Sequence, residues 1–166
     1  MTVKEVIRKR KSIRKFNVGS LTDEQLRTLM EAAQWAPSAS NMQPYEFIIV
    51  KDDKLKAELV KNASIQRFIT SAAVVFVGIG DPTREKWYKI DLAIAMEHLA
   101  LQAAELGLGS CWIGSFAEQK VKEILKIPAD KQVIALLPIG IPGEDPPARS
   151  RKSLDNLFYT NYYKSH

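Results

Sequence analysis

The stretch 86–106, KWYKIDLAIAMEHLALQAAEL, carries the strongest helix signal in the sequence. Its apolar residues cover nearly every face of a helix, and a helix that is apolar all round is buried all round. We therefore predict either a central core helix or a helix that turns one face toward a second subunit. Gly107 follows as the expected C-terminal cap. Within this helix we expect Asp91 and Glu97 on the surface and His98 in a packed, hydrogen-bonded position.

Apolar runs outward from this helix predict strands at 45–50, 72–79, 110–113 and 132–139. Periodic runs predict helices at 3–10, from 22 to just before Pro37, at 54–61 and at 118–125. For the second of these helices we expect a capping box between Thr22 and Gln25. Its expected apolar stripe consists of Leu26, Leu29, Met30 and Ala33. The irregular alternation of strands and helices predicts an α+β sandwich with helices around a small mixed sheet.

The length and composition favour a single globular domain over residues 1–166. The chain has 166 residues, of which 46% are hydrophobic and 26% are charged. Prolines at 142, 146 and 147 oppose regular structure, so we expect residues 141–166 to form an irregular, extended tail. The sequence shows neither a secretory signal nor an apolar run of membrane-spanning length, and we expect a cytoplasmic protein that does not bind membranes.

The positive charge is concentrated at one end of the chain. Lys and Arg outnumber Asp and Glu by 24 to 19, which gives a net charge of +5. Residues 1–16 hold seven Lys or Arg against a single acid, Glu5, so the rest of the chain is close to neutral. This segment predicts an anionic partner, a solvated basic face or a nucleic-acid-binding arm.

Two arginine clusters could bind one phosphate group. On an extended segment, residues spaced by two share a face. Arg10, Ser12 and Arg14 therefore suit a phosphate monoester, which guanidinium groups bind through paired charged hydrogen bonds. Arg149 and Arg151 repeat the spacing near the other end of the chain. The two clusters could hold one dianion from both sides, but the sequence leaves open whether they meet.

Two further segments could contact a flat ligand. Loop 37–43, PSASNMQ, carries amide side chains that suit the edge of a heteroaromatic ring, or that cap a turn. Glycines at 107, 109 and 114 permit close approach of the backbone to a planar group. Cys111 lies in an apolar run and is expected to be a buried small hydrophobe. We expect no metal site, because imidazole and thiol groups are too few, so a cofactor should carry any chemistry.

Four blocks of the chain together resemble the nitroreductase family of FMN-dependent, NAD(P)H-oxidising flavoproteins. The blocks are RKSIRKF (10–16), AAQWAPSASNMQPYEFIIV (32–50), DLAIAMEHLALQAAELGLGSCWIG (91–114) and LLPIGIPGEDPPARSRKSL (136–154). The resemblance runs over about residues 3–157. It implies a three-layer-like sandwich with a mainly antiparallel central sheet, and a homodimer with FMN at the subunit interface.

The resemblance also implies roles for individual residues. Arg10, Lys11, Ser12 and Arg14 match the first FMN-binding block, with Arg10 and Ser12 at the phosphate and ribityl end. Arg14 would lie near the pyrimidine edge and stabilise the reduced flavin electrostatically, and no other catalytic side chain is implied. The other matches are Arg149 and Arg151 at the phosphate; Pro37, Ser38, Ala39, Asn41 and Gln43 from the partner subunit; and Ile113, Gly114 and Ser115 against the ring, where a backbone N–H at Gly114 or Ser115 would face N5. Residues 64–67 match a further ring contact only loosely.

The implied activity is transfer of hydride from NADH or NADPH to FMN, followed by reduction of a nitroaromatic, quinone or related conjugated acceptor in a ping-pong scheme. Other flavin chemistry on the same scaffold stays open: an ene reductase, a dehalogenase, an azoline-type oxidase or a flavin-fragmenting enzyme. A flavin-binding protein without turnover and a nucleic-acid-binding module are further alternatives. Segment 80–91 is short compared with longer relatives, which implies a more open pocket. Trp35, Trp87, Tyr88 and Trp112 could line that pocket or serve as ordinary packing.

Overall fold

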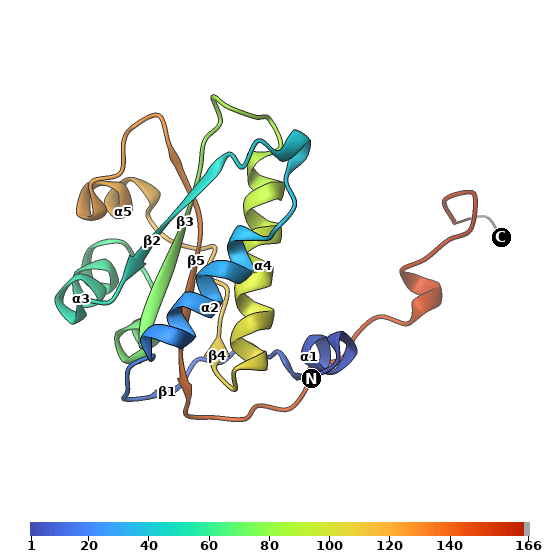
Figure 1. Ribbon diagram of the computed structural model, residues 1–166, viewed down its shortest axis with the longest axis horizontal. Coiled ribbons are helices and arrows are strands. Elements are labelled where there is room, and N and C mark those ends of the chain that lie inside the picture. The colour runs from blue at the N-terminus through green and yellow to red at the C-terminus, as the bar shows by residue number, and fades with distance from the viewer. Residues whose placement is uncertain (165–166) are drawn as a thin grey trace.

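The computed structural model describes residues 1–164, so Ser165 and His166, the end of the predicted tail, lie outside the described residues. Figure 1 shows the arrangement of the elements. In chain order they are α1 (Val3–Lys9), β1 (Phe16–Asn17), α2 (Asp23–Gln34), η1 (Ala39–Asn41), β2 (Tyr45–Val50), α3 (Asp53–Asn62), η2 (Arg67–Ser71), β3 (Val74–Gly80), α4 (Tyr88–Glu105), β4 (Gly109–Ser110), α5 (Glu118–Leu125), β5 (Gln132–Pro142) and η3 (Leu154–Asn156).

The sheet is antiparallel at every pair of strands in the described chain. Its order is β1-β5-β3-β2, with β4 also paired to β5. A parallel contribution comes from an isolated bridge between Ser12 and Ser110. The predicted strand at 110–113 is shorter than expected, because Ile113 joins the sheet only through a bridge to Leu136. The expectation of an α+β fold with a mainly antiparallel sheet is confirmed.

Helices cover both faces of the sheet, which gives the predicted three layers. Figure 1 shows α2 and α4 on one side of the strands and α3 and α5 on the other. Successive residues of a strand point to opposite faces. Accordingly, Phe76 and Leu137 pack in the core beneath α2 and α4, whereas Val77 and Leu136 pack in the core beneath α3 and α5. Every residue of β3 is buried, as a strand covered on both faces requires.

Helix α4 is the central helix of the first core, but it is not buried all round. Leu92, Met96 and Leu99 are fully buried against the sheet, whereas Ile90 is 53% exposed. The first alternative, burial on every face within one chain, does not hold for Ile90, and the second alternative, a face turned toward a second subunit, stays a prediction. Gly107, at φ +75°, ends the helix as expected, because glycine adopts this left-handed conformation without strain.

Helix α2 begins as the sequence predicts. The Thr22 side chain accepts a hydrogen bond from the backbone of Gln25, and the Gln25 side chain accepts one from the backbone of Thr22. Leu29 and Ala33 are buried on its inner face. Met30, expected on the same stripe, is 49% exposed. The stripe is therefore narrower than predicted, and Met30 faces outward beside a cavity described below.

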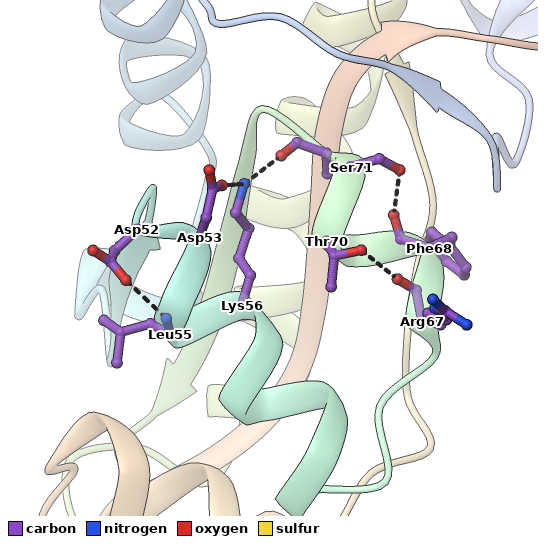
Figure 2. A network of polar contacts seen from close by, with 9 residues as sticks. Asp52, Asp53, Leu55, Lys56, Arg67, Phe68, Thr70 and Ser71 are labelled. Atoms are coloured by element: carbon purple, nitrogen blue, oxygen red, sulfur yellow. Dashed lines mark hydrogen bonds and ion pairs between the residues drawn. The ribbon is translucent and has the colours of Figure 1, made fainter.

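A buried lysine ties α3 to the start of β3. The Lys56 ammonium donates to the carbonyl of Ala72 at 2.7 Å and lies 2.7 Å from a carboxylate oxygen of Asp53 (Figure 2). In the same network the Thr70 and Ser71 hydroxyls donate to carbonyls of their own turn. A buried charge is tolerated only when it is paired and hydrogen-bonded. This network fixes η2 beside α3.

The C-terminal segment leaves the body of the molecule. Strand β5 continues to Pro142, so the predicted irregular tail begins later than residue 141. Beyond it the chain runs past α1 and away from the sheet (Figure 1). Its last part exposes a series of large apolar side chains: Leu154, Leu157, Phe158, Tyr159, Tyr162 and Tyr163. Within residues 1–164, no helix has the length and hydrophobicity to cross a membrane.

Candidate functional site

An antiparallel run of contacts brings the two ends of the chain together. In the pairing of β1 with β5, Phe16 lies opposite Pro142 and Asn17 opposite Ile141. One step further, the Gly143 backbone N–H donates to the Lys15 carbonyl at 2.8 Å. The C-terminal segment therefore leaves the sheet directly beside the basic N-terminal segment.

Two acidic side chains extend this pairing toward the arginines. The Glu144 carboxylate accepts a 2.6 Å hydrogen bond from the backbone N–H of Arg14. The Lys11 ammonium donates to the Asp145 carboxylate at 2.6 Å. Lys11, a predicted cofactor-binding residue, thus already has an anionic partner within the chain. Glu144 and Asp145 were not among the predicted site residues. The sequence held one indication of their role. The two acids lie between the last predicted strand and the arginines 149 and 151, and acids at this place can pair with the basic N-terminal segment.

The two arginine clusters line one cavity of about 550 Å³, which we call the basic cavity. Its walls come from α1, from the extended segment that follows α1, and from the C-terminal segment. Every predicted residue of both clusters lines it. The lining residues are Ile7, Arg8, Arg10, Lys11, Ser12, Arg14, Pro146, Pro147, Ala148, Arg149 and Arg151. The question that the sequence left open is therefore answered: the two clusters meet.

Arg10 is held at the inner end of this segment by an acid from α4. Its guanidinium Nε lies 3.6 Å from a carboxylate oxygen of Glu97. The second oxygen of Glu97 accepts a hydrogen bond from the indole N–H of Trp112 at 3.1 Å. Glu97 lies partly on the surface, as expected, but it also links Arg10 to Trp112. Trp112 is thus hydrogen-bonded in the packing of the protein, which was one of the two roles considered for it.

Cys111 is buried, near Ser12 and Arg14 of the basic cavity. Burial raises the pKa of its thiol, because it disfavours the thiolate, although Arg14, Ser12 and Arg10 act in the opposite direction. A raised pKa makes a cysteine a poor nucleophile. This environment agrees with the expectation of a buried small hydrophobe.

Loop 37–43 is a strained, internally bonded turn away from the basic cavity. Ser40, Asn41 and Gln43 have φ angles of 50°, 55° and 47°, which non-glycine residues seldom adopt. The Gln43 backbone N–H donates to the Ser38 hydroxyl at 3.0 Å. The side-chain amide N–H of Gln43 donates to the backbone carbonyl and to the side-chain oxygen of Asn41. Strain of this kind persists only where neighbouring contacts hold it, and it concentrates at functional sites.

The loop faces two other cavities. Asn41 and Gln43 line a cavity of about 680 Å³ between α2 and β2. Pro37, Ser38 and Ala39 line one of about 280 Å³ beside the start of α4. A single chain therefore does not bring loop 37–43 to the basic cavity.

The third predicted group is also separate from the basic cavity. Ile113 is buried through its bridge to Leu136, and Gly114 and Ser115 are exposed. Tyr88 is buried and donates to Gln132 at 2.7 Å, which supports packing, whereas Trp35 is 82% exposed. Among residues 1–164, no three His, Cys, Asp or Glu side chains cluster where they could hold a metal ion.

Asp91 corrects a further expectation. The sequence predicts Asp91 on the surface of its helix, but the residue is only 3% exposed. The carboxylate is covered by loop 37–43, and both of its oxygens accept the backbone N–H of Ala39, at 3.1 and 3.2 Å. Helical spacing alone did not reveal this contact, because it depends on where a distant loop folds.

Comparison with known proteins agrees with this architecture. The family model described as "Nitroreductase family" matches residues 7–66 and 58–141. An NADPH-dependent oxidoreductase of Staphylococcus haemolyticus is 28% identical over 188 residues, covering 98% of this chain and 74% of that protein. The chain also resembles a crystal structure of a nitroreductase family protein from Clostridium novyi NT (38% identity, TM-score 0.81, 87% of each chain). An FMN-dependent nitroreductase from Clostridium difficile R20291 is similar as well (30% identity, TM-score 0.87, 95% of this chain and 98% of that one).

The sandwich architecture and these similarities define an oxidoreductase of the nitroreductase fold. The chain belongs to the Nitroreductase family, whose model covers most of its length.

Proposed function

We propose that this chain is an FMN-dependent oxidoreductase that oxidises NADH or NADPH and reduces nitroaromatic, quinone or related conjugated acceptors. One observation carries the proposal: arginines from both ends of the chain line the basic cavity. A phosphate dianion is the ligand that such a set of guanidinium groups fits best. The named activities of the relatives support an oxidoreductase, and one of the similar structures is that of a nitroreductase described as FMN-dependent.

Within the basic cavity, Arg10, Ser12, Arg149 and Arg151 would hold the phosphate end of FMN. The ion pair of Arg10 with Glu97 fixes the direction of that guanidinium before any ligand arrives. Lys11 serves a different purpose in this proposal. Its pairing with Asp145 holds the C-terminal segment in place, so that Arg149 and Arg151 face the N-terminal cluster.

When bound, FMN would supply the redox chemistry: it can accept hydride from a nicotinamide nucleotide and pass electrons to a second substrate. The contribution of the chain is electrostatic. Arg14 lines the same cavity as the phosphate-binding residues, so its guanidinium would stabilise negative charge that develops on the ring. Backbone N–H groups at Gly114 or Ser115 would orient the ring.

We further propose that the active unit is a homodimer in which loop 37–43 of one subunit completes the site of the other. Two observations support this. The loop lies apart from the basic cavity within one chain. The exposed apolar side chains of the C-terminal segment and of α4, such as Phe158 and Ile90, need a partner surface. A homodimer of this kind would bring the loop to the partner's basic cavity and would bury these apolar side chains.

Nicotinamide nucleotide and acceptor would occupy the same open site in turn, which is a ping-pong scheme. The choice between NADH and NADPH, the acceptor within the conjugated class and the cytoplasmic location stay predictions. The nucleic-acid alternative is less well supported, because Arg10 and Lys11 are paired with Glu97 and Asp145 instead of projecting freely.

A competition between FMN and riboflavin tests the proposal. The apoprotein should bind FMN at least tenfold more tightly than riboflavin, because each charged hydrogen bond to phosphate contributes about 1.5–3 kcal/mol. Equal affinity for the two flavins would contradict the assignment of the basic cavity. The matching measurement of function is steady-state oxidation of NADH and NADPH with a quinone and with a nitroaromatic compound.

A further inference from the structure

Asp91 is a buried carboxylate whose position in the fold calls for an explanation. It lies in the first turn of α4 and is 3% exposed. No ion pair involves it within the described chain, 1–164. A buried charge without a cation is costly unless hydrogen bonds stabilise it. The positive end of the α4 dipole supplies part of that stabilisation.

One backbone group in loop 37–43 donates a hydrogen bond to Asp91. The Ala39 N–H lies 3.1 and 3.2 Å from the two carboxylate oxygens of Asp91. Ala39 is the first residue of the turn η1, and the strained residues Ser40 and Asn41 follow directly after it. The hydrogen bond from Ala39 to Asp91 therefore fixes the residue at which the strained backbone begins.

The rest of the loop is bonded mainly to itself. Asn41 and Met42 donate backbone hydrogen bonds to Ser38 and Ala39, both at 3.0 Å. These bonds hold the shape of the turn, but they do not tie it to the body of the protein. Asp91 provides that tie, from the long helix that packs on the sheet.

The neighbouring Tyr45 is consistent with a negative charge at this place. Its hydroxyl is buried without a hydrogen-bond partner within the described structure. Burial raises the pKa of the Tyr45 hydroxyl most, and the nearby charge of Asp91 raises it further. Within residues 1–164, the Ala39 N–H is the only hydrogen-bond donor to the Asp91 carboxylate.

We propose that Asp91 is a positioning residue, which fixes loop 37–43 through the Ala39 N–H so that the loop meets the flavin of the partner subunit. This inference rests on the proposed function. It assigns to Asp91 no contact with FMN and no proton transfer.

The test compares three single variants, the double variant Asp91→Ala/Ala39→Pro and one stability control, each made in the whole chain. Asp91→Ala removes the acceptor, whereas Asp91→Asn keeps a side-chain oxygen for the Ala39 N–H. Ala39→Pro removes the donor instead, and the extended backbone of Ser38 (ψ 157°) is compatible with a following proline. Leu59→Ala, in the core under the opposite face of the sheet, is the control for loss of stability alone.

The expected result is about tenfold weaker FMN binding in Asp91→Ala and in Ala39→Pro, with an altered visible spectrum of the bound flavin. Asp91→Asn should stay within about threefold of wild type, and Leu59→Ala should change the melting temperature without changing the spectrum. The double variant Asp91→Ala/Ala39→Pro should bind FMN no more weakly than either single variant, because both substitutions remove the same interaction. Hydrogen exchange at the Ala39 amide of the apoprotein should become faster in Asp91→Ala.

Wild-type affinity and spectrum in Asp91→Ala would overturn the inference, as would additive losses in the double variant. If Asp91→Ala does not fold, Ala39→Pro and the rescue by Asp91→Asn decide the question. Wild-type protein that binds no FMN would instead overturn the proposed function, and the inference with it.

Discussion

The Glu144 carboxylate accepts a 2.6 Å hydrogen bond from the backbone N–H of Arg14, across 130 residues of sequence. It continues the antiparallel pairing of β1 with β5 and turns the C-terminal segment toward the N-terminal arginines. Together with the pairing of Lys11 and Asp145, it explains how two clusters far apart in the sequence line one cavity.

Glu144→Ala should weaken FMN binding even though Glu144 lines no part of the basic cavity. Losing the acceptor frees the C-terminal segment, so Arg149 and Arg151 spend less time facing the phosphate. We expect a loss of about threefold to tenfold, the effect of one hydrogen bond. Glu58→Ala, an exposed change on α3, is the control and should leave the affinity unchanged. Fluorescence titration of the apoprotein with FMN measures both.

Arg149→Ala should reduce the preference for FMN over riboflavin. The lost charged hydrogen bonds are worth about 1.5–3 kcal/mol, or more than tenfold in affinity for FMN, and riboflavin has no phosphate to lose them. Lys152→Ala, a cation of the same segment that does not line the basic cavity, is the matched control. An equal loss for both flavins would mean that Arg149 acts on the fold and not on phosphate.

Arg14→Ala should slow flavin reduction more than it weakens FMN binding. Its charge matters most when the ring gains negative charge, so we expect a reduction rate at least about tenfold lower. Stopped-flow reduction by NADH without air gives the rate, and titration gives the affinity. An unchanged rate would remove Arg14 from the electrostatic role.

Subunit mixing tests the shared site. A variant in the basic cavity, Arg149→Ala, and a variant in the loop, Asn41→Ala, should each be impaired alone. In a heterodimer of the two, one site carries both defects and the other carries none, so mixing should restore about one quarter of the wild-type activity after random exchange. If subunit exchange is verified and the mixture is no more active than the average of the two variants, both residues belong to the site of a single subunit.

Acid stability should depend on Asp81. A hydrogen bond from Lys131, and others from Thr83, lower its pKa to about 2 in the folded protein. The unfolded chain, with its ordinary pKa near 3.8, takes up the proton first as the pH falls. The stabilisation is therefore present above about pH 4 and is lost as the pH falls toward 2. Urea midpoints of wild type and Asp81→Asn should differ at pH 5 and converge near pH 2.

Much of the fold could be predicted from local patterns. The capping box of Thr22 and Gln25 and the end of α4 at Gly107 depend on neighbours in the sequence, and both are confirmed. The exposure of Ile90 and Met30 could not be predicted in the same way, because an apolar side chain does not reveal whether it packs within one chain or against another.

The candidate site shows the same division. The residue types and spacing of Arg10 and Arg149 indicated a phosphate group, but only the fold could show that they share a cavity. Asp91 and Glu144 were missed as site residues because each acts through a backbone N–H distant in the sequence. Such contacts depend on chain topology, which hydrophobic periodicity does not encode.

The most direct test of the account is a visible absorption spectrum of the purified protein, followed by addition of NADH or NADPH without air. The account predicts oxidised-flavin absorption, either as purified or after incubation with FMN, that bleaches with at least one of the two nucleotides. A protein that stays colourless after incubation with FMN, or whose flavin absorption neither nucleotide bleaches, would contradict it.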